Sequence, residues 1–503
     1  MYSSVKTVVF MGIKCLTVEV QCSLSAGIPS FNIVGLPGKS VAESKERVRY
    51  ALSNTGIQLP SKKIIINLSP SDIPKQGTHY DLPIALSILV ILKKIPEIYD
   101  SYFVIGELSL DGSVISTRGI IAALLYVQNQ CGVIIPYQNN PLIPNNDRLI
   151  MAKNLQEIIT RLCAKNIIYD TISNENIPAS NTAKVITLDD IKGQHVAKRS
   201  LIISVSGNHH LLLIGTPGSG KTLLAKSSIS LLPELSKEEY ILINQIYNLS
   251  NAYNEPLQVI RPFREPHHSA SMASIIGGGK FAQPGEIVLA NNGILFLDEL
   301  AEFPSNIIDA LRQPLENKTI TINRVDYKCS YPCKFQLIAA MNPCKCGYFG
   351  NQEQQCKRAP SCAIEYQQKV STPFMDRIDI KVYVPELSFQ EMHRSEKSEL
   401  SLQKIKEAIY NAHQIQQNRY QDFDFKFNAE IPNFLTEEIC PINEASKKLL
   451  EKAYNQSIFS ARSYHKILRV ARTIADLDAS QNIEYSHICE ALSFSRTIQQ
   501  NKL

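Results

Sequence analysis

Residues 215–222, Gly-Thr-Pro-Gly-Ser-Gly-Lys-Thr, decide how the middle of this chain folds. The apolar run Leu211–Ile214 precedes them and Leu223–Lys226 follows, so the order is strand, glycine loop and helix start. Glycines let such a loop wrap around a polyphosphate with its N–H groups pointing inward, and the helix N-terminus adds a favourable dipole. Because the strand and the helix are both in place, we favour phosphate binding over a glycine turn that matches by accident.

Two side chains of the loop have specific expected roles. Lys221 would reach the β- and γ-phosphates, and the Thr222 hydroxyl would be a ligand of magnesium. The rest of the cradle is formed by Gly215, Thr216, Pro217, Gly218, Ser219 and Gly220. The stretch therefore predicts a site for a nucleotide and Mg²⁺.

A second apolar run, Ile294–Leu297, ends in Asp298 and Glu299. Open α/β sheets bind ligands at the carboxyl ends of their strands, so both acids are expected beside the phosphates. Asp298 would hold the magnesium, and Glu299 would act as the general base that polarises the attacking water. A strand that ends in solvated acids is common by itself, but its pairing with a phosphate loop favours hydrolysis.

Three more residues fit phosphoryl transfer. Asn342 ends a third apolar strand, where its amide could bond the γ-phosphate or orient the water. Arg377 follows Asp376, and an arginine from a neighbouring subunit can stabilise the charge that develops in the transition state. Arg462 opens a helix near the C-terminus and could reach the phosphates across an inter-domain cleft. Each of these alone would be read as a solvated arginine or a turn asparagine.

Size and composition limit the class of protein. The chain has 503 residues, of which 44% are hydrophobic and 20% charged, and its formal net charge is +5. That charge permits nucleic-acid contact without arguing for it, because only clustered positive charge would. No signal peptide or membrane-length apolar run is evident, so we expect a cytoplasmic protein without a membrane partner. Its twelve cysteines are then expected to be thiols or metal ligands.

The pattern along the chain predicts an α/β fold with several domains. Residues 1–168 mix short strands and helices, and residues 169–186 form a linker rich in small polar residues. Strands and helices alternate through 187–390, as in a parallel sheet with crossover connections. Residues 391–503 are helical, with apolar positions spaced by three and four.

The order of these motifs resembles the AAA+ ATPase module. Three stretches resemble its magnesium-chelatase-like branch, namely 264–268 with the glycines 277–279, QPGEIVLANNGILFLDELAEF at 283–303 and AAMNPCKCG at 339–347. Three others resemble the ComM/YifB family: FNIVGLPGKSVAESKERVRYAL at 31–52, KKIIINLSPSDIPKQGTHYDLPIAL at 62–86 and ARSYHKILRVARTIADL at 461–477. The resemblance covers essentially the whole chain. One departure is Thr372, where the family usually has glycine, and it would alter only the local turn.

The resemblance implies a ring-forming, hexameric ATPase that uses ATP and Mg²⁺, with each site at a subunit interface. Arg377 is then the finger that acts in trans, Asn342 is sensor 1 and Arg462 is the sensor-2 arginine. Arg469 lies seven residues further along the same helix, on nearly the same face, so helical phase cannot separate the two. We favour Arg462.

The first domain resembles the Lon-protease fold, which pairs a serine nucleophile with a lysine base. Alignment on the serine loop, 75–81, places His79 where the serine would be, and alignment through 118–123 places alanine where the lysine would be. A serine hydroxyl needs its base to become nucleophilic, and here both groups are missing. We therefore expect a catalytically inactive domain that binds or assembles, and ATP-dependent proteolysis would contradict this.

Four cysteines follow the Asn342 strand within one loop: Cys344, Cys346, Cys356 and Cys362. Tetrahedral zinc takes four converging thiolates, so this cluster is a possible Zn²⁺ site. The spacing departs from the usual C-x2-C pairs, and four reduced cysteines packed as small hydrophobic groups are the alternative.

Two insertions could line the pore of a ring, one at 274–280 and one at 318–331, which alternates like a β-hairpin. The side chains that would contact single-stranded or branched DNA are Lys280, Arg324, Lys328 and the base-stacking Tyr327. An ordinary solvated hairpin is nearly as well supported.

We favour a DNA-translocating motor, a helicase that drives branch migration during recombination in natural transformation, as ComM-like proteins are understood to be. The alternatives are a chelatase-type ATPase that remodels a protein partner for metal insertion and a chaperone-like regulator without nucleic acid. Dedicated magnesium-chelatase ATPase subunits lack the Lon-like domain, which argues against the first alternative. Salt-sensitive DNA binding with DNA-stimulated hydrolysis would separate the motor from both.

Overall fold

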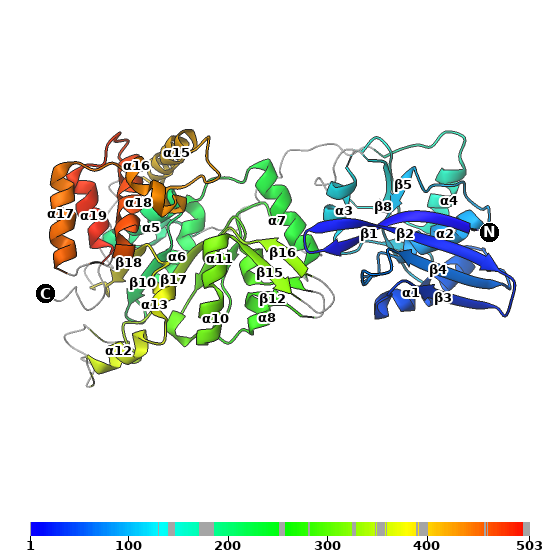
Figure 1. Cartoon of the computed structure of the whole chain (residues 1–503), viewed down its shortest axis with the longest axis horizontal. Coiled ribbons are helices and arrows are strands. Elements are labelled where there is room, and N and C mark those ends of the chain that lie inside the picture. The colour runs from blue at the N-terminus through cyan, green and yellow to red at the C-terminus, as the bar shows by residue number, and fades with distance from the viewer. Residues whose placement is uncertain are drawn as a thin grey trace.

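The computed structural model describes residues 2–128, 130–138, 146–170, 186–250, 257–279, 282–323, 328–347, 349, 358, 360–388, 391, 401–456, 459 and 461–495. Figure 1 shows an elongated chain with the N-terminal domain at one end, a central domain, and a helical C-terminal region at the other end. Most of the predicted linker, 171–185, lies outside the described residues. No helix among the described residues is long and apolar enough to cross a membrane.

The N-terminal domain is built on a mixed sheet with the strand order β3-β4-β2-β1-β5-β8-β9. Its strands are β1 (Tyr2–Met11), β2 (Lys14–Ser25), β3 (Ser30–Val34), β4 (Lys63–Ser69), β5 (Tyr102–Val104), β8 (Gly132–Pro136) and β9 (Leu149–Ala152). A small hairpin joins β6 (Glu107–Leu108) to β7 (Val114–Ile115), and the helices are α1 (Lys39–Asn54), α2 (Asp81–Ile91), α3 (Ile120–Val127) and α4 (Leu155–Cys163). Every residue of α2 is buried, as expected for a helix that is apolar on all sides.

Strand β1 has different partners along its two edges. It pairs with β2 in antiparallel fashion over its full length, from Tyr2 opposite Ser23 to Met11 opposite Lys14. Its pairing with β5 is parallel and limited to Lys6 opposite Phe103. The last residues of β1 therefore extend beyond β5.

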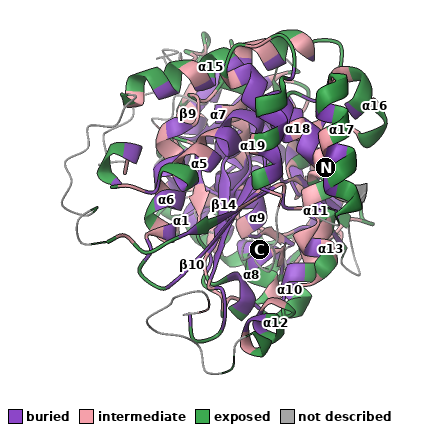
Figure 2. Ribbon diagram, turned by 90° about the vertical axis from the view of Figure 1, so that its left-hand side faces the viewer, coloured by how far each residue is buried: buried purple, intermediate pink, exposed green. Residues whose placement is uncertain are grey.

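The central domain is a parallel sheet with the strand order β11-β14-β17-β10-β18. Its strands are β11 (Phe263–Arg264), β14 (Ile294–Leu297), β17 (Gln336–Met341), β10 (Leu211–Gly215) and β18 (Ile380–Val384). β10, β14 and β17 are buried throughout, because both faces of a parallel sheet are covered (Figure 2). All five strands run in the same direction, so their carboxyl ends lie at one edge.

Short helices surround this sheet: α5 (His195–Gly207), α6 (Lys221–Ser227), α7 (Lys237–Leu249), α8 (Met272–Ile275), α9 (Glu286–Leu289), α10 (Ser305–Ala310), α11 (Arg312–Asn317), α12 (Ser361–Gln367) and α13 (Thr372–Met375). Two hairpins project from it, β12 (Gly277–Gly278) with β13 (Gln283–Pro284), and β15 (Thr319–Asn323) with β16 (Lys328–Pro332). The second corresponds to the hairpin expected at 318–331. Residues 324–327 between its two strands, which include Arg324 and Tyr327, lie outside the described residues, and so does Lys280.

The C-terminal region is helical, as expected, with α15 (Leu402–Arg419), α16 (Asn433–Ile439), α17 (Glu444–Asn455), α18 (Ala461–Leu477) and α19 (Tyr485–Ser493). Helix α18 is central, because it packs against α5, α15 and α19 and shares one hydrophobic core with the sheet. The buried Asp476 of α18 bonds two guanidinium groups, those of Arg419 and Arg472. The predicted class, an α/β core followed by a helical region, is confirmed.

The N-terminal and central domains meet along α7. Asn248 caps the start of α3, since its side-chain oxygen accepts from Ile121 N at 3.2 Å and its carbonyl accepts from Gly119 N at 3.2 Å. Gln245 donates to the carbonyl of Ile13 at 3.1 Å, in the β1–β2 turn. A helix of the central domain thus holds the end of the N-terminal sheet.

Candidate active site

The glycine loop lies between β10 and α6, at the carboxyl edge of the central sheet. Gly218 and Gly220 have φ values of +80° and +91°, a left-handed region that favours glycine. Gly215 is required for a different reason, because a Cβ there would lie 2.3 Å from the carbonyl oxygen of Val384. The sequence pattern thus produces a tight loop whose backbone an extended ligand can approach closely.

The side chains of the loop fit a phosphate chain. Lys221 Nζ is buried and donates to the carbonyls of Gly215 at 2.8 Å and Thr216 at 2.7 Å. Burial lowers the pKa of Lys221 below its ordinary value, although Asp298 and Glu299 act in the opposite direction. The hydroxyls of Thr216 and Ser219 are also buried and have no partner among the described residues. Unsatisfied donors beside a buried cation suit an anion, so the loop fits the phosphates of ATP.

Asp298 and Thr222 meet at the same edge. The Thr222 hydroxyl donates to Asp298 Oδ2 at 2.7 Å, which brings together one hydroxyl and one carboxylate. Oxygen ligands of this kind are the ones Mg²⁺ takes, with waters and substrate phosphates completing its octahedron. The pair therefore fits a magnesium ion bound next to the phosphates.

Glu299 has an unusual backbone conformation, with φ at +52°. Left-handed non-glycine residues are uncommon and concentrate at functional sites, where the surrounding structure fixes them. Its N–H donates to Asp298 Oδ1 at 2.9 Å, and its carboxylate oxygen lies 3.3 Å from His268 Nδ1. The side chain remains about half exposed, at 53%, so water can reach it.

His268 is a site residue that our sequence reasoning did not single out. Its segment is held by two ion pairs: Arg264 bonds both carboxylate oxygens of Glu286, at 2.6 and 2.9 Å, and Glu265 pairs with Lys226 of α6 at 2.9 Å. The hydrogen bond with Glu286 is the largest cause that raises the pKa of Arg264. The available signal was the run Glu-Pro-His-His, which we used only as a family likeness.

Asn342 and Gln194 complete the surroundings of the loop. Asn342 follows β17, and its Oδ1 lies 3.3 Å from Lys221 Nζ, so the third strand brings it beside the glycine loop. Gln194, which sequence reasoning missed, donates to the carbonyls of Ser219 at 3.3 Å and Pro385 at 2.7 Å. Gln194 thereby ties the loop to the end of β18.

Arg377 lies at the opposite edge of the sheet. It precedes β18, whose first residue, Ile380, pairs with Leu211 at the start of β10, whereas Lys221 follows the end of β10. Its guanidinium donates to the carbonyl of Pro373 at 2.6 Å and pairs with Glu316. A single chain therefore does not bring Arg377 to its own glycine loop.

Arg377 lies in the wall of a cavity of about 730 Å³. Its lining includes the cations Arg312, Lys318, Lys334, Lys466 and Arg469 and the acids Glu316, Asp376, Asp379 and Glu430. The Nε groups of Arg312, Arg377 and Arg469 are buried and have no partner among the described residues. Three arginines that each carry an unsatisfied N–H line one cavity, and such a cluster suits an anion.

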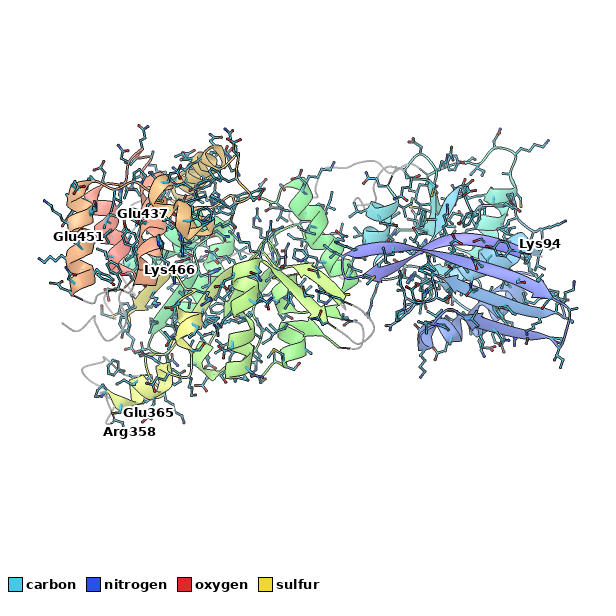
Figure 3. All side chains as sticks on the ribbon, in the orientation of Figure 1. Lys94, Arg358, Glu365, Glu437, Glu451 and Lys466 are labelled. Carbon is cyan, nitrogen blue, oxygen red and sulfur yellow. The ribbon has the colours of Figure 1, made fainter. Side chains whose placement is uncertain are left out.

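Helix α18 borders the same cavity. Lys466, labelled in Figure 3, donates to the carbonyl of Ile378 at 3.0 Å, and burial lowers its pKa to about 8. Arg469 donates to the carbonyl of Ile431 at 2.8 Å, and Thr473 contacts His209, just before β10, at 2.7 Å. This part of α18 thus lies at the edge of Arg377 and not beside Lys221. The side chain of Arg462 is outside the described residues, so the choice between Arg462 and Arg469 stays a prediction.

Three of the four predicted cysteines converge. The sulfur atoms of Cys344, Cys346 and Cys362 lie within 4.8 Å of one another, and those of the first two are 3.1 Å apart. Cys356 lies outside the described residues. The loop also packs on the glycine loop, since a Cβ on Gly347 would lie 2.6 Å from the ring of Pro217. The three sulfurs fit a soft metal such as zinc with one position left for a further ligand.

Comparison with known proteins agrees with this geometry. Residues 187–392 match the family model for magnesium chelatase, subunit ChlI; residues 18–139 match subunit ChlI of Mg-chelatase; and residues 399–495 match the ChlI C-terminal model.

Three relatives illustrate the range of sequence identity between this chain and known proteins. Competence protein ComM of Haemophilus influenzae is 38% identical, covering 97% of this chain and 96% of its own. The uncharacterized protein YifB of Escherichia coli is 36% identical, covering 98% and 96%. Magnesium-chelatase subunit ChlI of Euglena gracilis is 24% identical over 33% of this chain and 54% of its own. The chain therefore belongs to the ComM/YifB family of magnesium-chelatase-like AAA+ ATPases.

Proposed function

We propose that this chain is an ATP-driven ring motor that acts on DNA and hydrolyses ATP between adjacent subunits. The observation that carries the chemistry is the convergence of Lys221, the Thr222–Asp298 pair and Glu299 at one edge of the sheet. These are the parts that phosphoryl transfer needs: a cation on the phosphates, ligands for the metal and a base for the water.

Each side chain has one role in this proposal. Lys221 balances the charge of the β- and γ-phosphates, and Thr222 with Asp298 holds the magnesium. Glu299 takes the proton from the attacking water, while His268 keeps the Glu299 carboxylate in position at 3.3 Å. Asn342 orients the water without repelling it. Mg²⁺, when bound, neutralises charge on the phosphates.

Arg377 is assigned to the nucleotide of the neighbouring subunit. Its place at the opposite edge, in a cavity with unsatisfied guanidinium groups, supports this assignment. We keep Arg462 as the candidate for the sensor-2 role, since it is the second residue of α18, the helix that borders the same cavity. Such a site requires a closed assembly of subunits, and we propose a hexamer.

DNA is the proposed substrate of the motor. More specifically, we propose that the protein drives branch migration during recombination in natural transformation. Support comes from a relative named as a competence protein that matches over nearly the full chain and from the β15–β16 hairpin, whose exposed face carries Lys328. The chelatase-type or chaperone-like alternative, with a protein partner, rests on the family models and keeps the same ATPase chemistry. A DNA substrate of this kind would place the protein's work in the cytoplasm.

We predict that a three- or four-stranded DNA junction stimulates ATP hydrolysis several-fold and is itself unwound or migrated. The logarithm of the DNA-binding constant should fall linearly with the logarithm of the salt concentration, because protein contacts to phosphates release counterions from the DNA. Steady-state hydrolysis at several salt concentrations, with a gel assay of junction products, measures both effects. Lys221→Ala, which should not turn over ATP with or without DNA, is the control. If branched DNA neither binds nor stimulates hydrolysis, the motor function is excluded.

The cysteine cluster is proposed to hold structural Zn²⁺, with Cys344, Cys346, Cys362 and Cys356 as ligands. Metal analysis of the purified protein should then find about one zinc per chain, and Cys346→Ser should lower that content. Cys489→Ser, which alters an exposed cysteine of α19, is the matched control and should leave the metal content unchanged. A zinc content well under one per chain in the unaltered protein would mean that the cysteines pack as thiols.

A further inference from the structure

A second cavity, of about 390 Å³, lies where the N-terminal and central domains meet. Most of its wall comes from the N-terminal domain, including residues 9–12, 73–74, 76–79 and 116–118, and the rest includes Leu249, Cys329 and Tyr331 of the central domain. In Figure 1 the end of β1 approaches β16 at this place. The volume falls within the range of ligand pockets. No step of ATP hydrolysis uses it.

The chemistry of the wall is mixed. Phe10, Ile73 and Leu249 supply apolar surface, while Thr117 and Gln283 supply hydroxyl and amide groups. Sites that bind organic ligands combine such surface with a few polar groups that fix orientation. A ligand with both apolar side chains and hydrogen-bonding groups would suit this wall.

Thr117 is the polar group that most directly indicates a ligand. It is 4% exposed, it lines the cavity, and its hydroxyl has no partner among the described residues. Buried hydroxyls are nearly always hydrogen-bonded, because an unmade bond is unfavourable. A donor or acceptor on a bound molecule would satisfy it.

The backbone of β1 supplies a second indication. The carbonyl of Val8 accepts from His79 Nε2 at 2.9 Å, so it points away from β2. Backbone groups alternate in direction along a strand, so the N–H and C=O of Phe10 point to the same side as those of Val8. β5 pairs with β1 only at Lys6, and no strand of the described chain pairs with this edge at Phe10. An extended chain can add hydrogen bonds to such an edge.

We propose that this cavity binds a short extended peptide segment. The peptide's amide groups would bond the backbone of Phe10 and the hydroxyl of Thr117, and its apolar side chains would occupy the surface around Ile73 and Leu249. A peptide matches all three observations at once, since it carries alternating donors and acceptors along a chain of apolar side chains. Among the described residues, none that we propose for ATP hydrolysis lines this cavity.

The test uses the full-length protein and a defined mixture of probes. The mixture contains N-acetylated, C-amidated tetrapeptides of alanine, leucine, phenylalanine, serine and glutamine, together with aliphatic and aromatic alcohols of similar mass that lack amide bonds. Equilibrium dialysis followed by mass spectrometry gives the retained compounds and their affinities. Neither ATP nor DNA is present, so a failure of the motor function does not affect the result.

We expect the unaltered protein to retain a subset of the peptides. Ser116→Trp should bind these peptides at least about tenfold more weakly, because the new side chain would extend from an exposed position into the mouth of the cavity. Thr160→Trp, on the exposed side of α4, should bind like the unaltered protein. Thr117→Val should weaken binding by up to about tenfold, the value of one neutral hydrogen bond, without lowering the Tm.

Three results would overturn the proposal: no peptide is retained, the alcohols are retained in preference to the peptides, or Ser116→Trp and Thr117→Val both bind the same peptides as tightly as the unaltered protein. If Ser116→Trp fails to fold, Thr117→Val decides alone, because removing an unsatisfied buried hydroxyl does not threaten the fold.

Discussion

Glu299→Gln is expected to abolish ATP turnover while nucleotide binding stays close to that of the unaltered protein. The amide keeps the shape of the side chain and leaves the Thr222–Asp298 pair intact, so the magnesium site survives. The attacking water loses its base, and general-base catalysis contributes roughly two to four orders of magnitude in rate. Steady-state phosphate release, with ATP binding measured separately by a fluorescent analogue, gives the two quantities.

Glu302→Gln is the matched control for this change. Glu302 lies three residues further along, is exposed, and pairs with Lys369 instead of His268. Its substitution should leave turnover within about twofold of the unaltered rate, because exposed ion pairs contribute little. Near-normal hydrolysis by Glu299→Gln would assign the base to another residue.

Arg377→Ala should leave ATP binding nearly intact and remove most hydrolysis. An arginine finger contributes roughly three to five orders of magnitude to phosphoryl transfer, so the loss should equal or exceed that caused by removing the base. Arg358→Ala removes an exposed arginine that pairs with Glu365 and serves as control. The measurement is again steady-state hydrolysis with separate binding.

Mixing variants tests whether Arg377 acts in trans. Rings of Arg377→Ala alone and of Glu299→Gln alone should both be inactive. In a mixed ring, a site formed by the base of an Arg377→Ala chain and the arginine of a Glu299→Gln chain is complete, so activity should partly return. Mixtures that stay as inactive as the separate variants would show that the two residues serve one chain's site.

Contiguous motifs made most of the nucleotide site predictable. The glycine loop and the strand that ends in Asp298 and Glu299 are each encoded by consecutive residues, so their local structure can be predicted from the sequence. The apolar strand that ends in Asn342 likewise brings that residue beside Lys221. His268 and Gln194 were missed because their roles depend on contacts between segments that only the folded sheet brings together. The packing of Gly347 on Pro217 could not be read from spacing for the same reason.

The sequence predicted that the C-terminal region is helical, but it did not predict where these helices pack on the central sheet. Periodicity identified residues 391–503 as helical, because an amphipathic helix leaves its buried face as apolar residues spaced by three and four. Periodicity says nothing about which edge of the sheet a helix will border. Only the contacts of Lys466 and Thr473 place α18 at the edge of Arg377. Thr372, the family departure, proves to be the first residue of α13, where a helix tolerates it.

The separation of Lys221 and Arg377 on opposite edges has a consequence for how the protein behaves at low abundance. If each site takes its arginine from a neighbour, a lone chain has the nucleotide pocket but not the full machinery to cleave what it holds. Specific activity should then fall on dilution, with a steep dependence on protein concentration near the assembly threshold. Free chains would bind ATP without hydrolysing it. ATP would be consumed only where the local concentration of chains is high enough for a ring to close.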